Sequence, residues 1–212
     1  METLVIPAII AQTQRELDWM LDMVKGKVDR VMLDVMDGEF VANVSLDFDF
    51  EIRNELEYEA HLMVENPLDW VEKNAEKVNI AILHIETLEE VEAAIDYVKG
   101  MGLKVTLALN PETKINNVTH YLSDIEAILV MTVFPGKYGG KFLPETLEKV
   151  RSIRRIDESI PIEVDGGINP RNARLARESG ANLFASGSYI FKSDDLNRAV
   201  NELKEAVMYA EP

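Results

Sequence analysis

Two aspartates, Asp34 and Asp165, carry the residue pattern most suited to acid–base chemistry. Each one closes a short apolar run and lies close to glycine, in the segments Asp34-Val-Met-Asp-Gly38 and Val164-Asp-Gly-Gly167. Two carboxylates that reach one site from separate strands can take a proton from one face of a carbon and return a proton to the other face. The pattern therefore indicates epimerase chemistry.

The elements that must position these aspartates are apolar runs that alternate with amphipathic stretches along the whole chain. The runs are rich in Val, Ile and Leu and are continuous, which is typical of strands buried on both faces. Eight such runs favour one closed (β/α)8 TIM barrel spanning residues 1–212, and an open doubly wound sheet is the alternative. The predicted strands are Leu4–Ile10, Val28–Val35, Tyr58–Val64, Asn79–Ile85, Leu103–Leu109, Ala127–Val133, Ile160–Val164 and Asn182–Ala185.

Local signals mark where the helices between these strands begin. A Thr followed three residues later by Glu is a capping box, and Asn followed by Pro supplies an N-cap and a first helical residue. The capping boxes are Thr13 with Glu16 and Thr87 with Glu90, and the Asn-Pro pairs begin at Asn66 and Asn169.

Composition narrows the classes of function. The chain has 212 residues, of which 47% are hydrophobic, and no cysteine, so disulfides and thiolate chemistry are excluded. Its net charge of −16 repels nucleic acid and anionic membranes. The first residues lack the basic region of a signal peptide, and no apolar segment is long enough to span a bilayer. We expect a cytoplasmic protein without nucleic-acid or membrane partners.

The working residues of such barrels stand at the C-terminal ends of the strands. Those ends supply Asp34, His61, Met63, His84, Glu86, Asn110, Met131, Thr132 and Asp165. His61 completes a plausible divalent-metal set with the two aspartates, and a satisfied buried histidine is the alternative. His120 falls in a connection at the opposite rim and is assigned no role.

Small residues follow the last two predicted strands. Gly166-Gly167 and the Ser186-Gly187-Ser188 turn are suited to binding a phosphate through backbone amides. The segment from Phe134 to Lys141 contains Gly136, Gly139, Gly140 and Lys137, which suits a lid that closes over a ligand. An ordinary flexible connection is the alternative interpretation of that segment.

Taken together, these motifs resemble the ribulose-phosphate 3-epimerase family, and the similarity runs from about Ile6 to Phe191. The matching segments are Asp34-Val-Met-Asp-Gly-Glu-Phe-Val-Ala-Asn43, His61-Leu-Met-Val-Glu-Asn-Pro67, His84-Ile-Glu86, Leu107-Ala-Leu-Asn-Pro111, Met131-Thr-Val-Phe-Pro-Gly136, Val164-Asp-Gly-Gly-Ile168 and Ser186-Gly-Ser188.

The resemblance implies a barrel of the ribulose-phosphate-binding type that interconverts D-ribulose 5-phosphate and D-xylulose 5-phosphate. It implies that Asp34 and Asp165 are the acid–base pair and, with His61, ligands of a divalent metal such as Zn, Fe, Mn or Co. The remaining implied roles are lining of the site by Met36, Met63 and Met131, and phosphate binding by Gly166, Gly167, Gly187 and Ser188, with Gly136 and Gly139 on the substrate side.

The sequence departs from the family pattern at several positions that face the site. Met32 stands where the family usually has a histidine that serves as a fourth metal ligand, and methionine is a poor ligand for hard divalent ions. Ala8 replaces a substrate-side serine, Ala42 replaces a proline, and Phe134 replaces the asparagine that usually opens the lid. The resemblance therefore implies a metal site with three protein ligands and weaker metal retention.

Three other functions stay open from the sequence. The bound compound is a sugar phosphate in each of them. The first is epimerisation of another ketose phosphate, such as a six-carbon one, and the second is a non-catalytic phosphosugar-binding protein. The third is a lyase, which is disfavoured because no lysine ends a predicted strand and Asp34-Val-Met-Asp37 lacks the lysine of the related metal-dependent lyases. We also expect a homo-oligomer.

Overall fold

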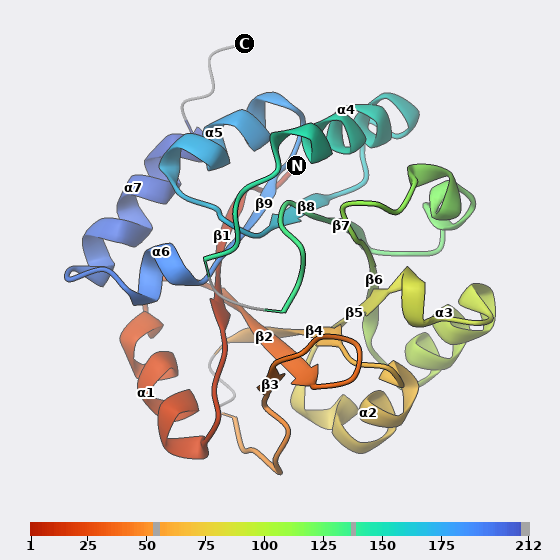
Figure 1. The fold of residues 1–212 in the computed structure, drawn as a ribbon, viewed down its shortest axis with the longest axis horizontal. Coiled ribbons are helices and arrows are strands. Elements are labelled where there is room, and N and C mark those ends of the chain that lie inside the picture. The colour runs from red at the N-terminus through yellow and green to blue at the C-terminus, as the bar shows by residue number, and fades with distance from the viewer. Residues whose placement is uncertain (53–55, 137–138, 209–212) are drawn as a thin grey trace.

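Eight parallel strands close into a barrel in the computed structural model, which describes residues 1–52, 56–136 and 139–208. Pairing of the first strand with both the second and the last completes the closure (Figure 1). All eight predicted runs overlap one of these strands, so the predicted TIM-barrel fold is confirmed. The strands are β1 (Leu4–Ile9), β2 (Arg30–Asp37), β4 (Glu57–Met63), β5 (Ile80–His84), β6 (Lys104–Leu109), β7 (Ala127–Met131), β8 (Ile162–Asp165) and β9 (Leu183–Ser186).

Helices surround the barrel on its outer side (Figure 1). They are α1 (Gln14–Val24), α2 (Pro67–Asn74), α3 (Val91–Gly100), α4 (Leu147–Ile156), α5 (Pro170–Glu178), α6 (Ser188–Phe191) and α7 (Leu196–Met208). Among the described residues, no helix is both long enough and apolar enough to cross a membrane.

Two connections differ from a strict alternation of strand and helix. The described part of the β2–β4 connection contains a short strand, β3 (Val44–Ser45), which pairs antiparallel with the end of β2. Only 3-10 turns, η3 (Ile115–Asn117) and η4 (Thr119–Tyr121), lie between β6 and β7. The sequence does not predict β3, because a two-residue strand has no detectable periodicity.

One of the two predicted capping boxes forms in a modified version, with the glutamate bonded to the residue before the N-cap. The Thr13 hydroxyl accepts a hydrogen bond from the Glu16 amide at 3.3 Å, and the Glu16 carboxylate accepts one from the Gln12 amide at 2.7 Å. The helix after Asn66 begins at Pro67 as predicted, although the Asn66 side chain makes no capping bond. Asn169 caps α5 by accepting a hydrogen bond from the Asn172 amide.

The capping box predicted at Thr87 and Glu90 is wrong. The helix α3 begins only at Val91, and Glu90 caps it without a side-chain hydrogen bond. The Thr87 hydroxyl instead donates to the carbonyl oxygen of His84 at 2.9 Å. The strand-end turn that contains His84 has therefore taken the hydroxyl that the sequence pattern assigned to the helix.

The barrel interior is largely apolar but contains a layer with charged side chains. Met32 is fully buried inside the barrel, in a cluster with residues such as Ile6 and Ile82. Glu59 and Glu163 are each only 1% exposed. A guanidinium nitrogen of Arg30 lies 3.4 Å from a carboxylate oxygen of Glu59, so one cation partly balances the layer.

Burial controls the protonation of these two carboxyl groups. It raises the pKa of Glu59 to about 7, although Glu163 and Arg30 act in the opposite direction. Burial, followed by the charge of Glu59, raises the pKa of Glu163 well above its ordinary value. Two carboxyl groups this close cannot both ionise without a large electrostatic cost, so one of them keeps a proton and donates it to the other.

We expect this pair to make the protein less stable as the pH rises. Above the ordinary glutamate pKa of 4.5 the unfolded chain releases these protons, whereas the folded protein keeps them to about pH 7 or higher. The free energy of unfolding therefore falls across that interval. Replacing Glu163→Gln supplies a permanent donor to Glu59, so we expect a gain on the order of 1 kcal/mol or more at pH 8.

Urea denaturation at pH 5 and pH 8 tests this expectation. Glu148→Gln is the matched control, because the Glu148 side chain is 61% exposed on α4. A Glu163→Gln variant that follows the pH dependence of the unchanged protein at both pH values would contradict the shared proton.

Candidate active site

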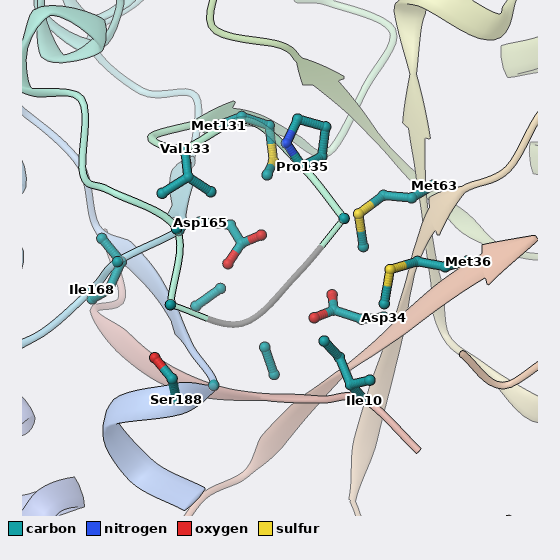
Figure 2. A pocket seen from close by; sticks show the side chains of 18 residues that line it. Ile10, Asp34, Met36, Met63, Met131, Val133, Pro135, Asp165, Ile168 and Ser188 are labelled. Atoms are coloured by element: carbon teal, nitrogen blue, oxygen red, sulfur yellow. The ribbon is translucent and has the colours of Figure 1, made fainter. Parts of the chain in front are cut away.

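A cavity opens at the C-terminal ends of the strands. Figure 2 shows Asp34 and Asp165 approaching it from different strands, with Met36, Met63 and Met131 along its wall. The structure brings these five predicted residues together with the small residues predicted for substrate or phosphate binding. The latter are Gly136, Gly139, Gly166, Gly167, Gly187 and Ser188.

Asp34, His61 and Asp165 form a compact cluster at the floor of this cavity. Asp34 and His61 are register partners on β2 and β4, which places their side chains next to each other on the inner face. The Nδ1 atom of His61 lies 3.2 Å from an Asp34 oxygen and 3.6 Å from an Asp165 oxygen. One ligand atom from each residue lies within 4.8 Å of the others, a spacing that a divalent ion can bridge.

Burial makes the protonation of this cluster sensitive to its neighbours. Burial, followed by the negative charge of Asp34, raises the pKa of Asp165 to about 7. Burial also disfavours the charged form of His61, but the hydrogen bond to Asp34 and the nearby carboxylates outweigh it and raise the His61 pKa. A carboxyl group with a pKa near 7 can act as either acid or base at neutral pH.

A second histidine extends the cluster away from the cavity. The Nε2 atoms of His61 and His84 are 2.9 Å apart, and Nδ1 of His84 lies 3.3 Å from a Glu86 oxygen. Burial lowers the pKa of His84 to about 4, so His84 is neutral at pH 7. The sequence analysis placed His84 and Glu86 at a strand end but assigned them no role, although a His-x-Glu spacing at that point was a usable signal.

The loop after β2 contacts the segment that follows β7. One Asp37 oxygen accepts hydrogen bonds from the amides of Glu39 and Phe40, and the other accepts one from the Glu65 amide. Farther along the loop, the Asn43 side chain donates to the carbonyl oxygen of Gly136. The sequence does not predict this link between two loops, because its partners are far apart in the chain.

The backbone after β8 approaches the lid segment closely. Gly166 has a φ of 112°, and Gly167 has a φ of 64°. A Cβ atom at Gly166 would collide with the Val133 side chain. Lys137, which the sequence analysis considered as part of the lid, lies outside the described residues.

Comparison with known proteins identifies the family. Residues 4–191 match the Ribulose-phosphate 3 epimerase family. The chain belongs to the ribulose-phosphate 3-epimerase family. It is 34% identical to the ribulose-phosphate 3-epimerase of Bacillus subtilis over 193 residues, which cover 86% of this chain and 89% of that protein. It is 38% identical to the Methanocaldococcus jannaschii protein of the same name over 191 residues, 86% of this chain and 81% of that protein.

Solved structures show the same fold at low sequence identity. The 3-keto-L-gulonate-6-phosphate decarboxylase of Vibrio cholerae superposes with a TM-score of 0.72 at 10% identity, covering 100% of each chain. The 3-hexulose-6-phosphate synthase of Salmonella typhimurium superposes with a TM-score of 0.71 at 14% identity, covering 98% of this chain and all of that one. These likenesses concern the barrel alone.

Against the pattern of the ribulose-phosphate 3-epimerase family, the departures occupy defined places. Ala8 lines the cavity at the end of β1, where the sequence resemblance led us to expect a serine. Met32 lies one inward position before Asp34 on β2 and is fully buried. Phe134, which replaces an asparagine, is 59% exposed. The first two changes remove polar atoms from the cavity and its floor, whereas the third adds an apolar surface group.

We expect Gly166→Ala to destabilise the protein by more than about 2 kcal/mol, because an unfavourable φ adds to a collision with Val133. Gly26→Ala is the matched control, because Gly26 has a φ of 71° and open space around its Cα. Left-handed backbone alone costs that control about 1 kcal/mol. Equal losses in urea denaturation would show that contact with Val133 does not constrain Gly166.

Proposed function

We propose that this protein interconverts D-ribulose 5-phosphate and D-xylulose 5-phosphate by two-base proton transfer at C3. The observation that carries the proposal is the placement of Asp34 and Asp165, which line one cavity from different sides of the barrel. Two carboxylates on opposite sides of a bound sugar are what inversion at one carbon requires. The family membership and the names of the relatives support the same reaction.

Proton transfer proceeds from one aspartate to the substrate and from the substrate to the other. In one direction Asp34 removes the C3 proton, which is acidic because C2 is a ketone, and an enediolate results. Asp165 returns a proton to the opposite face. The roles exchange in the reverse direction. Met36, Met63 and Met131 line the cavity between them and offer no group that competes for the proton.

The donor set of Asp34, His61 and Asp165 fits a divalent ion such as Zn, Fe, Mn or Co. Two carboxylates and one imidazole converge within 4.8 Å and suit the borderline and hard ions of that group. When bound, the ion supplies a Lewis acid that stabilises the negative charge of the enediolate. Met32 contributes no suitable ligand, so the protein supplies three ligands and leaves positions for substrate oxygens.

Backbone amides are the proposed phosphate-binding groups. Gly166, Gly167, Gly187 and Ser188 lie at one end of the cavity, at the turns after β8 and β9. The net charge of −16 disfavours an anionic substrate at long range, so local donors must offset that field. Gly136 and Gly139, from the lid segment, complete the substrate side of the proposed site. A homo-oligomer and a cytoplasmic location stay predictions.

We expect Asp34→Asn and Asp165→Asn each to lower epimerisation by about 10²–10⁴-fold, because an amide cannot accept the C3 proton. NMR in D₂O would follow both the formation of D-xylulose 5-phosphate from D-ribulose 5-phosphate and the incorporation of deuterium at C3. Glu148→Gln is the control, because Glu148 is exposed on α4 and does not line the cavity. Retained exchange in both aspartate variants would rule out the two-base assignment. If the unchanged protein exchanged the C3 proton of another ketose phosphate only, that compound would replace D-ribulose 5-phosphate as the proposed substrate.

We expect chelation to abolish C3 exchange and Zn²⁺, Mn²⁺, Fe²⁺ or Co²⁺ to restore it. Met32→His should raise the affinity for the ion, about tenfold or more, because it places an imidazole on the inward face beside Asp34. Competition with a chromophoric chelator measures that affinity. Met20→His on α1 is the control, since its site is remote from the cavity. Full exchange in chelator-stripped protein would contradict the metal assignment.

A further inference from the structure

We infer that Glu86, acting through His84, sets the tautomer of His61 and thereby presents the His61 Nδ1 lone pair to the metal. The inference rests on the proposed metal site and goes beyond it, because neither Glu86 nor His84 belongs to the proposed ligand set. Both are positioning residues in this scheme.

Four side chains form one uninterrupted hydrogen-bonded series, in the order Asp34, His61, His84 and Glu86. Nδ1 of His61 faces Asp34 and Asp165, and its Nε2 atom lies 2.9 Å from Nε2 of His84. Nδ1 of His84 lies 3.3 Å from a Glu86 oxygen. The second Glu86 oxygen accepts hydrogen bonds from the Asn110 amide and the Thr113 hydroxyl. Every nitrogen of both rings therefore has a partner.

The direction of each hydrogen bond follows from the carboxylate of Glu86 at one end of the hydrogen-bonded series. An ionised carboxylate only accepts hydrogen bonds, so His84 must donate from Nδ1. A neutral His84 then carries a lone pair on Nε2, and that lone pair can be satisfied only by an N–H on Nε2 of His61. With its one proton on Nε2, neutral His61 is left with a lone pair on Nδ1. That atom is the one that faces Asp34 and Asp165.

Counting protons leads to the same assignment. Three contacts join Asp34, His61, His84 and Glu86, and two neutral imidazoles supply only two protons. If the ion occupies the contact between His61 and the aspartates, the two protons fill the other two contacts. Any other arrangement leaves two acceptors facing each other or directs an N–H at the ion.

The chain is also held rigidly. His61 and His84 are both fully buried, so water does not offer an alternative partner. The centroids of their rings are 5.0 Å apart, and the ring planes are inclined by only 17°. The Phe40 ring lies 4.9 Å from the His84 ring, and the Thr87 hydroxyl binds the His84 carbonyl oxygen. A buried chain with no freedom to rotate transmits a choice of tautomer from one end to the other.

The tautomers can be measured directly in the Zn²⁺-loaded protein labelled with ¹⁵N-histidine. The chain has three histidines, so few imidazole signals overlap. Long-range ¹H–¹⁵N spectra should show the proton of His61 on Nε2 and that of His84 on Nδ1. The opposite tautomer at either ring in the unchanged protein would overturn the inference.

Glu86→Gln is the decisive variant, because it keeps the volume but has a single acceptor oxygen for donors on two sides. We expect a mixed tautomer signal at His61 and a Zn²⁺ affinity about 10–100-fold weaker in chelator competition. His84→Leu should weaken binding to a similar or greater extent. His120→Asn is the control, because His120 is exposed and remote from the site.

The outcomes separate this inference from the proposed function. An unchanged protein that binds Zn²⁺ through His61 Nδ1, together with a Glu86→Gln variant of equal affinity and equal tautomer, would overturn only the role of Glu86. An unchanged protein that binds no divalent ion would overturn the metal site and this inference with it. A variant that loses stability but keeps the His61 tautomer would show that Glu86 has a structural role alone.

Discussion

The close approach of two aspartates, one buried and one partly buried, is the constraint on which the rest of the site depends. Asp34 and Asp165 share the floor of a cavity, and their mutual repulsion must be offset by a proton, a cation or a hydrogen-bond donor. His61 lies between them with Nδ1 toward both oxygens, so it can donate a proton to them or join them in binding a metal. The repulsion from Asp34 helps to raise the pKa of Asp165, so that carboxyl group can gain or lose a proton near neutral pH.

Closure of the barrel brings the two aspartates this close together. Inward positions repeat every second residue, so Glu59, His61 and Met63 follow one another along β4 from the interior to the cavity. One layer is charged, the next could bind a metal, and the last is apolar. Buried carboxyl groups therefore occur at two depths, and only the upper pair opens to the cavity.

Much of the fold was predictable from the sequence, because each buried parallel strand has a local pattern, a continuous run of Val, Ile and Leu. The site residues at strand ends were predictable for the same reason. The Asn43–Gly136 contact and the His61–His84 contact were not, because each joins segments whose separation in space depends on strand register. The failed capping box at Thr87 shows the same limit, since a tertiary turn took the hydroxyl that the local pattern assigned to a helix.

The sequence by itself determined the order of strands, the acidic charge and the identity of the two aspartates. Family membership followed from those motifs together. The tertiary structure alone decided that Asp34, His61 and Asp165 meet, that Met32 is buried beneath them, and that His84 links His61 to Glu86. The reason is physical: strand propensity depends on neighbouring residues, whereas distances across a closed barrel depend on the register of all eight strands together.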